Sequence, residues 1–149
     1  MAAALVTVNE FLARVRSADV QSMTADLSEE EAGFLLEEIV GAASDDFRGY
    51  AAKRYGEAIT ATDQVKRFVV QIAWFDLCRR MGWNYSEADE RDEKRLRDRL
   101  GMIAKHQYDL IGQADKADPD RLTSARETEP SARVAGRRRT MTRETLKDY

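Results

Sequence analysis

The sequence has few of the residues that disulfides, zinc sites and turn-rich folds require. Its 149 residues include one cysteine, one histidine and two prolines. A single cysteine has no partner for an internal disulfide, and with one histidine it falls short of the four ligands of a structural zinc site. Both prolines, Pro119 and Pro130, follow residue 118, so the strongest helix breaker is missing from most of the chain. Sandwiches and barrels place proline and glycine at short intervals, so the composition favours an all-α fold.

Long hydrophobic runs and a secretory signal are also missing. The longest apolar stretch, residues 68–75, has eight residues and includes Gln71, whereas a membrane-spanning helix needs about 20. The N-terminal residues contain no basic segment and soon reach Glu10. We therefore expect no membrane contact and a protein that stays in the cytoplasm of the cell that makes it.

Charged residues are abundant but unevenly placed. They make up 34% of the chain, which suits long solvated helices, and give a net charge of −3. Residues 131–149 contain six basic and two acidic side chains, so residues 1–130 carry a net charge of −7. From residue 113 onward apolar residues become sparse. The sequence therefore predicts an acidic helical domain of residues 1–112 and an extended basic C-terminal arm of residues 113–149.

Capping signatures and apolar periodicity predict four helices in this domain. Three Ser or Thr residues precede an acidic residue with capping-box spacing: Thr7 and Glu10, Ser28 and Glu31, and Ser86 and Asp89. The second helix has a long apolar stripe, the third is apolar around most of its circumference, and the fourth is charged with one apolar seam that includes Gln107 and Leu110. The predicted helices span residues 7–17, 28–55, 62–81 and 86–112, with a connecting loop at residues 17–27 and helix stops at Gly56, Gly82 and Gly112.

Three glycines recur every eight residues inside the second predicted helix, at Gly33, Gly41 and Gly49. Glycine weakens a helix interior by about 1 kcal/mol. We infer that these positions allow close helix packing or a bend.

The sequence contains no recognisable catalytic, metal or cofactor site. The chain contains no Gly-x-Ser-x-Gly nucleophile elbow with which His106 could pair, so His106 is interpreted as a surface or seam residue. Cys78 lies among large apolar residues and is interpreted as an inert buried thiol. The adjacent carboxylates Asp45 and Asp46 point about 100° apart on a helix, so they do not converge. We predict no enzyme activity, metal or cofactor.

The only charge block of one sign lies in the arm, from residue 133 to residue 143. Two interpretations are open: a segment that docks on an acidic protein surface or on nucleic-acid phosphates, and a solubilising tail. Apolar residues near the block favour a protein partner. The candidate docking residues are Arg133, Arg137, Arg138, Arg139, Met141, Arg143, Leu146 and Tyr149.

Three segments of the domain follow one another in a characteristic order: VNEFL at 8–12, AASDDFRGYAAKRY at 42–55 and VKRFVVQIAWFDL at 65–77. In this order they resemble the head–tail adaptor (connector, or head-completion) proteins of tailed bacteriophages, over about residues 7–112. The second helix of such adaptors ends in a Gly-Tyr and Arg-Tyr signature, which Gly49, Tyr50, Arg54 and Tyr55 match. The loop before the third helix often contains proline in the family, but residues 57–62 contain none.

The resemblance implies a structural virion protein at the head–tail interface, present in the host cytoplasm before assembly. It would form a homo-oligomeric, dodecameric ring between the portal protein and a downstream neck or tail protein, around a channel that DNA crosses without sequence-specific contact. The arm would dock on the portal. Candidate subunit-interface residues on the fourth helix, which is alternatively a solvated helix, are Arg91, Asp92, Glu93, Lys94, Arg95, Arg97, Asp98 and Arg99. A second hypothesis is a small DNA-binding regulatory protein whose arm contacts phosphates, although the acidic domain would repel DNA.

Overall fold

The computed structural model describes residues 3–115, which form five α-helices and no strand. The helices are α1 (Val8–Arg14), α2 (Ser17–Met23), α3 (Glu29–Tyr55), α4 (Asp63–Arg80) and α5 (Glu87–Ala104). The all-α prediction is confirmed for this part of the chain. The prediction of four helices is wrong, because residues 17–23 form a helix.

Three helices begin at the capping boxes that the sequence predicts. At α3, the Ser28 hydroxyl accepts a hydrogen bond from the Glu31 amide, and the Glu31 carboxylate accepts one from the Ser28 amide. Equivalent pairs open α1 and α5, and Thr62 caps α4 by accepting from the Val65 amide. Each cap satisfies amides that have no partner inside the helix. The helix starts are therefore encoded locally.

The helix α2 forms where the sequence predicts a loop. Its N-cap residue, Arg16, makes no side-chain capping hydrogen bond, so the usual local signal is missing. Val20 and Met23 are spaced by three residues, lie on one face and are both buried. Short helices in proteins gain most of their stability from such packing rather than from intrinsic propensity.

The helix α5 ends at Ala104 rather than at Gly112, so the predicted span of 86–112 is wrong. His106 adopts a left-handed conformation with φ of 61°, and the Gln107 amide donates to the Met102 carbonyl at 2.8 Å. This hydrogen bond closes a Schellman motif, which usually has glycine at the left-handed position. The chain then turns back toward the end of α3, so Leu110 is buried without being helical.

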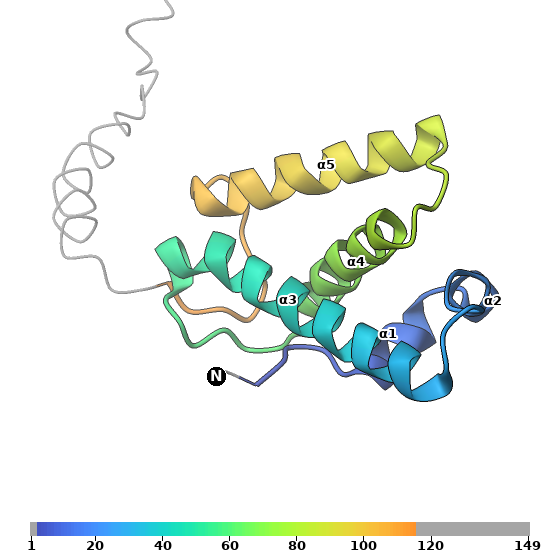
Figure 1. Cartoon of the computed structure of the whole chain (residues 1–149). Coiled ribbons are helices and arrows are strands. Elements are labelled where there is room, and N and C mark those ends of the chain that lie inside the picture. The colour runs from blue at the N-terminus through green and yellow to red at the C-terminus, as the bar shows by residue number, and fades with distance from the viewer. Residues whose placement is uncertain (1–2, 116–149) are drawn as a thin grey trace, which may run out of the picture. The chain divides into compact units, whose positions relative to one another are not determined.

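The longest helix, α3, packs against α1, α4 and α5 (Figure 1). Figure 1 shows α5 running over the C-terminal part of α3 and past α4, with α1 and α2 near the N-terminal half of α3. The buried rings of Phe47 and Phe68 stack with their centroids 5.9 Å apart. Nine residues of α4 are buried, among them Val65, Val69 and Leu77. No helix within residues 3–115 is long and apolar enough to cross a bilayer.

The glycines of α3 do not serve close packing among the described helices. A Cβ atom placed on Gly33, Gly41 or Gly49 would meet no atom within 4 Å. The expectation that they allow helices to approach closely is therefore wrong for residues 3–115.

Candidate functional site

Arg54, in the last turn of α3, anchors the segment that follows α5. Its side chain is only 8% exposed. The guanidinium donates to the Asp115 carboxylate at 2.8 Å, to the Asp109 carboxylate at 2.5 Å and to the Tyr108 carbonyl at 3.1 Å. It also lies 5.0 Å from the centre of the Tyr55 ring. The hydrogen bond to Asp115 raises the pKa of Arg54 above its usual value, against the opposing effect of burial, so the buried group stays charged.

Further hydrogen bonds hold residues 108–115 to the rest of the domain. The Leu110 amide donates to the Tyr55 hydroxyl at 2.9 Å. The Gln113 side chain accepts from the Thr60 amide at 2.9 Å and donates to the Thr60 carbonyl at 2.6 Å. The domain's contacts thus continue past residue 112, up to the root of the C-terminal arm.

The four residues of the adaptor-like signature fall into two groups. Arg54 and Tyr55 are buried and make the hydrogen bonds just described. Gly49 and Tyr50 are exposed on α3, and Tyr50 keeps 39% of its surface accessible. Only the Arg-Tyr half of the signature therefore has a visible structural task in residues 3–115.

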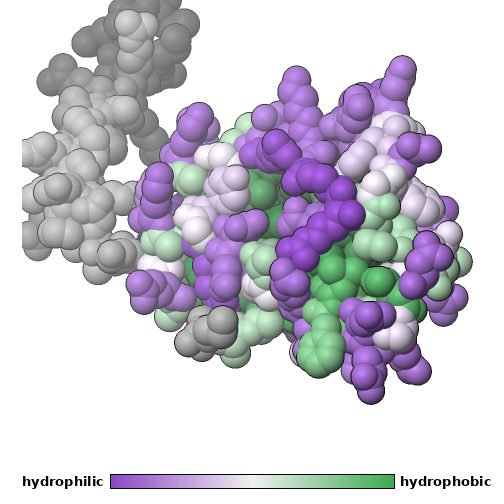
Figure 2. All heavy atoms as spheres, viewed as in Figure 1, coloured by the Kyte–Doolittle hydropathy of each residue, from purple (hydrophilic) through white to green (hydrophobic). Residues whose placement is uncertain are grey.

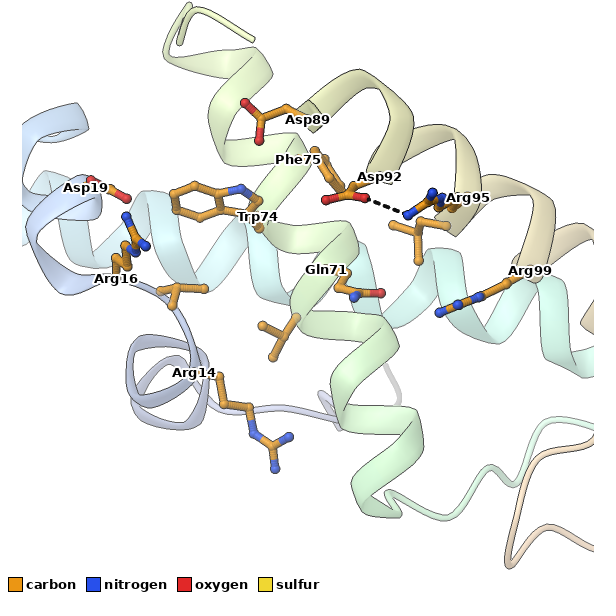
Figure 3. A pocket seen from close by; sticks show the side chains of 13 residues that line it. Arg14, Arg16, Asp19, Gln71, Trp74, Phe75, Asp89, Asp92, Arg95 and Arg99 are labelled. Atoms are coloured by element: carbon orange, nitrogen blue, oxygen red, sulfur yellow. Dashed lines mark ion pairs between the residues drawn. The ribbon is translucent and has the colours of Figure 1, made fainter. Parts of the chain in front are cut away.

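A groove of about 640 Å³ lies between α5, α4 and the link from α1 to α2 (Figure 3). Its apolar lining is the exposed edge of the core, formed by Val15, Val70, Trp74, Phe75 and Leu96. Trp74 is only partly buried, and Figure 3 shows its ring projecting from α4 toward Arg16 and Asp19. An open hollow with an aromatic floor suits a protruding apolar side chain of another molecule.

Charged side chains surround this apolar floor. The rim consists of four arginines and three aspartates: Arg14, Arg16, Arg95, Arg99, Asp19, Asp89 and Asp92. Arg14 and Arg95 pair with aspartates at 2.6 and 3.6 Å, whereas Arg16 and Arg99 form no ion pair within residues 3–115. Asp89 is occupied by the Ser86 cap, whose hydrogen bonds lower its pKa. The rim therefore offers two arginines that have no acidic partner in the described domain.

The predicted interface residues of the fourth helix all lie on α5 but not on one surface. Asp92, Arg95 and Arg99 line the groove. Glu93 is only 18% exposed and pairs instead with Arg79 and with Arg97. The remaining three, Arg91, Lys94 and Asp98, are exposed outside the groove. Sequence reasoning missed the groove residues Arg14, Arg16 and Trp74, because they come from elements that only the fold brings beside α5.

The titratable groups that the sequence singled out include Cys78 and His106. No group of three or more His, Cys, Asp or Glu side chains there is arranged to hold a metal ion. Cys78 is buried, and burial raises the pKa of its thiol to about 11, so it stays protonated at neutral pH. The interpretation of Cys78 as a buried thiol is confirmed, and His106 lies on the surface at the end of α5.

The predicted docking residues of the arm lie outside the described residues. They are Arg133, Arg137, Arg138, Arg139, Met141, Arg143, Leu146 and Tyr149. The anchor at Arg54 holds the described chain only as far as Asp115.

Comparisons with protein-family models, with curated proteins and with solved structures find no match for this chain. Its function is therefore inferred from its own residues and their geometry.

Proposed function

We propose that this chain is a structural head–tail adaptor of a tailed bacteriophage. It forms a ring of identical subunits in the neck of the virion, joins the portal to the next neck or tail protein, and encloses the DNA channel. The basic arm of residues 113–149 attaches each subunit to the portal. The proposal starts from the order of the three sequence segments and the Arg54–Tyr55 signature within them.

The Arg54 anchor is the observation that carries this proposal. An adaptor whose arm is bound to another protein must transmit force between the arm and its folded domain. The Arg54 guanidinium makes three hydrogen bonds to the segment that leads into the arm, and all three acceptors lie within residues 108–115. Charge-assisted hydrogen bonds of a planar guanidinium are strong and directional, which suits a fixed arm root.

The groove supports the ring. A ring of identical subunits is held by two different surfaces on each copy, which mate head to tail. The groove supplies one concave surface with an apolar floor and a charged rim, which matches the apolar centre and polar rim of protein interfaces.

Co-assembly with the portal protein encoded in the same phage genome tests the proposal. The full chain and the portal are mixed, and the product is analysed by sedimentation velocity and by cryo-electron microscopy. We expect a ring of this chain stacked on the portal. A chain truncated after Pro130 should lose attachment and keep its far-UV helicity, because the described helices end at Ala104. A matched control replaces Glu57 on the α3–α4 loop with Gln and should attach normally.

Two results would overturn the proposal. One is failure of the intact chain to bind the portal at micromolar concentrations. The other is binding to random duplex DNA whose affinity falls steeply with added salt, in the absence of portal binding, which would support the DNA-binding regulator instead.

A further inference from the structure

Phe34 on α3 is an aromatic residue that points into solvent. Its exposed fraction is 73%, the second largest among the exposed large hydrophobic residues of the domain. It precedes the buried Leu36 by two residues, which places it about 200° around the helix from the core-facing side. Figure 2 shows a surface that is mostly hydrophilic, with hydrophobic residues gathered in the lower part of the view, where Figure 1 shows α3.

Acidic residues surround Phe34 on every side along the helix. Residues three and four positions away are its neighbours on the helix surface, and all four are glutamates: Glu30, Glu31, Glu37 and Glu38. Glu31 closes the Ser28 capping box and Glu38 pairs with Arg80 at 2.8 Å. Glu30 and Glu37 form no ion pair within residues 3–115. Phe34 is therefore an exposed apolar side chain surrounded by four carboxylates, two of which are available to a partner.

The Trp74 groove has the complementary character. Its floor is apolar and its rim includes Arg16 and Arg99, the two arginines without an acidic partner in the described domain. Figure 3 looks into the groove and shows α3 running behind α4, so α4 separates the groove from α3. Because Phe34 points away from the core on α3, it faces away from the groove of its own chain. Contact between the two surfaces thus requires a second copy.

We propose that Phe34 of one copy docks in the Trp74 groove of the next copy, with Glu30 and Glu37 facing Arg16 and Arg99. An aromatic anchor in an apolar pocket, ringed by opposite charges, is the usual centre of a protein interface. The two surfaces are different and lie on different sides of the subunit, so the contact is heterologous and propagates from copy to copy until a ring closes. This inference rests on the proposed adaptor ring and names its subunit interface.

Disulfide trapping tests the contact in the full-length chain. Glu37→Cys and Gln71→Cys are introduced together, because Glu37 lies one turn from Phe34 on α3 and Gln71 is exposed and lines the groove, so the Phe34 anchor is kept. After mild oxidation, non-reducing electrophoresis should show a ladder that extends beyond the dimer. Either substitution alone should stop at the dimer, since one accessible cysteine per chain, beside the buried Cys78, joins at most two chains. The wild type, whose only cysteine is the buried Cys78, is the background control. Absence of the ladder from the double variant would overturn the proposal.

Charge reversal provides a second measurement that needs no cross-link. Glu30→Arg with Glu37→Arg should weaken self-association, alone or on the portal, by about tenfold or more, and Arg16→Glu with Arg99→Glu should do the same. All four changes in one chain should restore association. A two-charge control, Asp26→Arg with Glu57→Arg, should leave it unchanged. If the double variants associate more weakly and the variant with all four changes does not restore association, the proposed charge pairing is contradicted.

Phe34→Ala separates failure of this interface from failure of the adaptor proposal. If the wild type assembles on the portal and Phe34→Ala assembles equally well, the ring stands and the Phe34 contact is wrong. If the wild type neither self-associates nor binds the portal, both proposals fall.

Discussion

Replacement of Arg54 by Met should destabilise the domain and release the segment after α5. Met keeps much of the apolar stem but removes all three hydrogen bonds to residues 108–115. Loss of one partner of a fully buried ion pair costs about 3–5 kcal/mol, whereas a surface pair is worth about 0–1 kcal/mol. Arg54 itself is buried, but the side chains of Asp109 and Asp115 are 84% and 40% exposed, so water replaces part of what they lose. We therefore expect a loss of about 2–3 kcal/mol in the free energy of unfolding.

Urea unfolding of the full chain at pH 7, followed by far-UV circular dichroism, measures this loss. Hydrogen exchange at the Leu110 amide, which donates to the Tyr55 hydroxyl, reports whether the segment has detached. Arg54→Lys is the matched control, because lysine keeps the charge but lacks the planar fork that reaches several acceptors at once. It should retain about half of the stability that Met loses.

The coupling between Arg54 and Asp115 follows from a double-mutant cycle with Asp115→Asn. If the anchor works as described, the two substitutions together should cost less than the sum of their separate effects. A loss below about 0.5 kcal/mol for Arg54→Met, the size expected of an ordinary surface substitution, would refute the anchor. Unchanged protection of the Leu110 amide would refute it equally.

Three further predictions concern the domain alone. Phe47→Ala should cost about 3–5 kcal/mol in urea unfolding because Phe47 is fully buried, whereas Phe34→Ala should change unfolding by less than about 0.5 kcal/mol. His106→Gly should stabilise by about 0.5–1 kcal/mol, since glycine adopts φ of 61° without strain, and Lys105→Gly at φ of −92° should destabilise; equal effects would refute this reasoning. A hydrogen bond from a lysine on α4 lowers the pKa of Glu10 to about 2, so its stabilising effect is complete above the usual carboxyl pKa and is lost as the pH falls toward 2. Glu10→Gln should therefore be less stable at pH 7 and show a shallower loss in acid, which urea midpoints between pH 7 and pH 2 would measure.

Capping signals predicted helix starts accurately, whereas helix ends and short helices were harder to predict. The Ser28 hydroxyl and the Glu31 amide lie within one turn, so their hydrogen bond depends on no distant residue. Residues 17–23 carry no such signal and are helical because Val20 and Met23 find a place in the core. Gly112 was expected to end the last helix. The helix instead ends before His106, because the chain turns there and makes stabilising contacts with α3.

The candidate site was predicted only in part, for the same reason. Arg54 and Tyr55 were singled out by a sequence signature, but their partners were not. Asp109 and Asp115 lie 55 and 61 positions from Arg54 in the chain. Arg16, Trp74 and Arg99 line the same groove but come from three separate elements. The periodicity within one helix does not indicate which residues of other elements lie beside it.

The sequence by itself determined the all-α class of the described residues, the capped starts of four helices, the apolar character of α4 and the contrast between the acidic residues 1–130 and the basic residues 131–149. These properties follow from hydrogen bonds within one turn, from the 3.6-residue period and from composition, all of which act over short distances along the chain. Only the tertiary structure decided where α5 ends, what Arg54 binds, and that Phe34 and the Trp74 groove face different directions. Those features depend on packing between residues far apart in sequence, where burial and charge pairing override local preference.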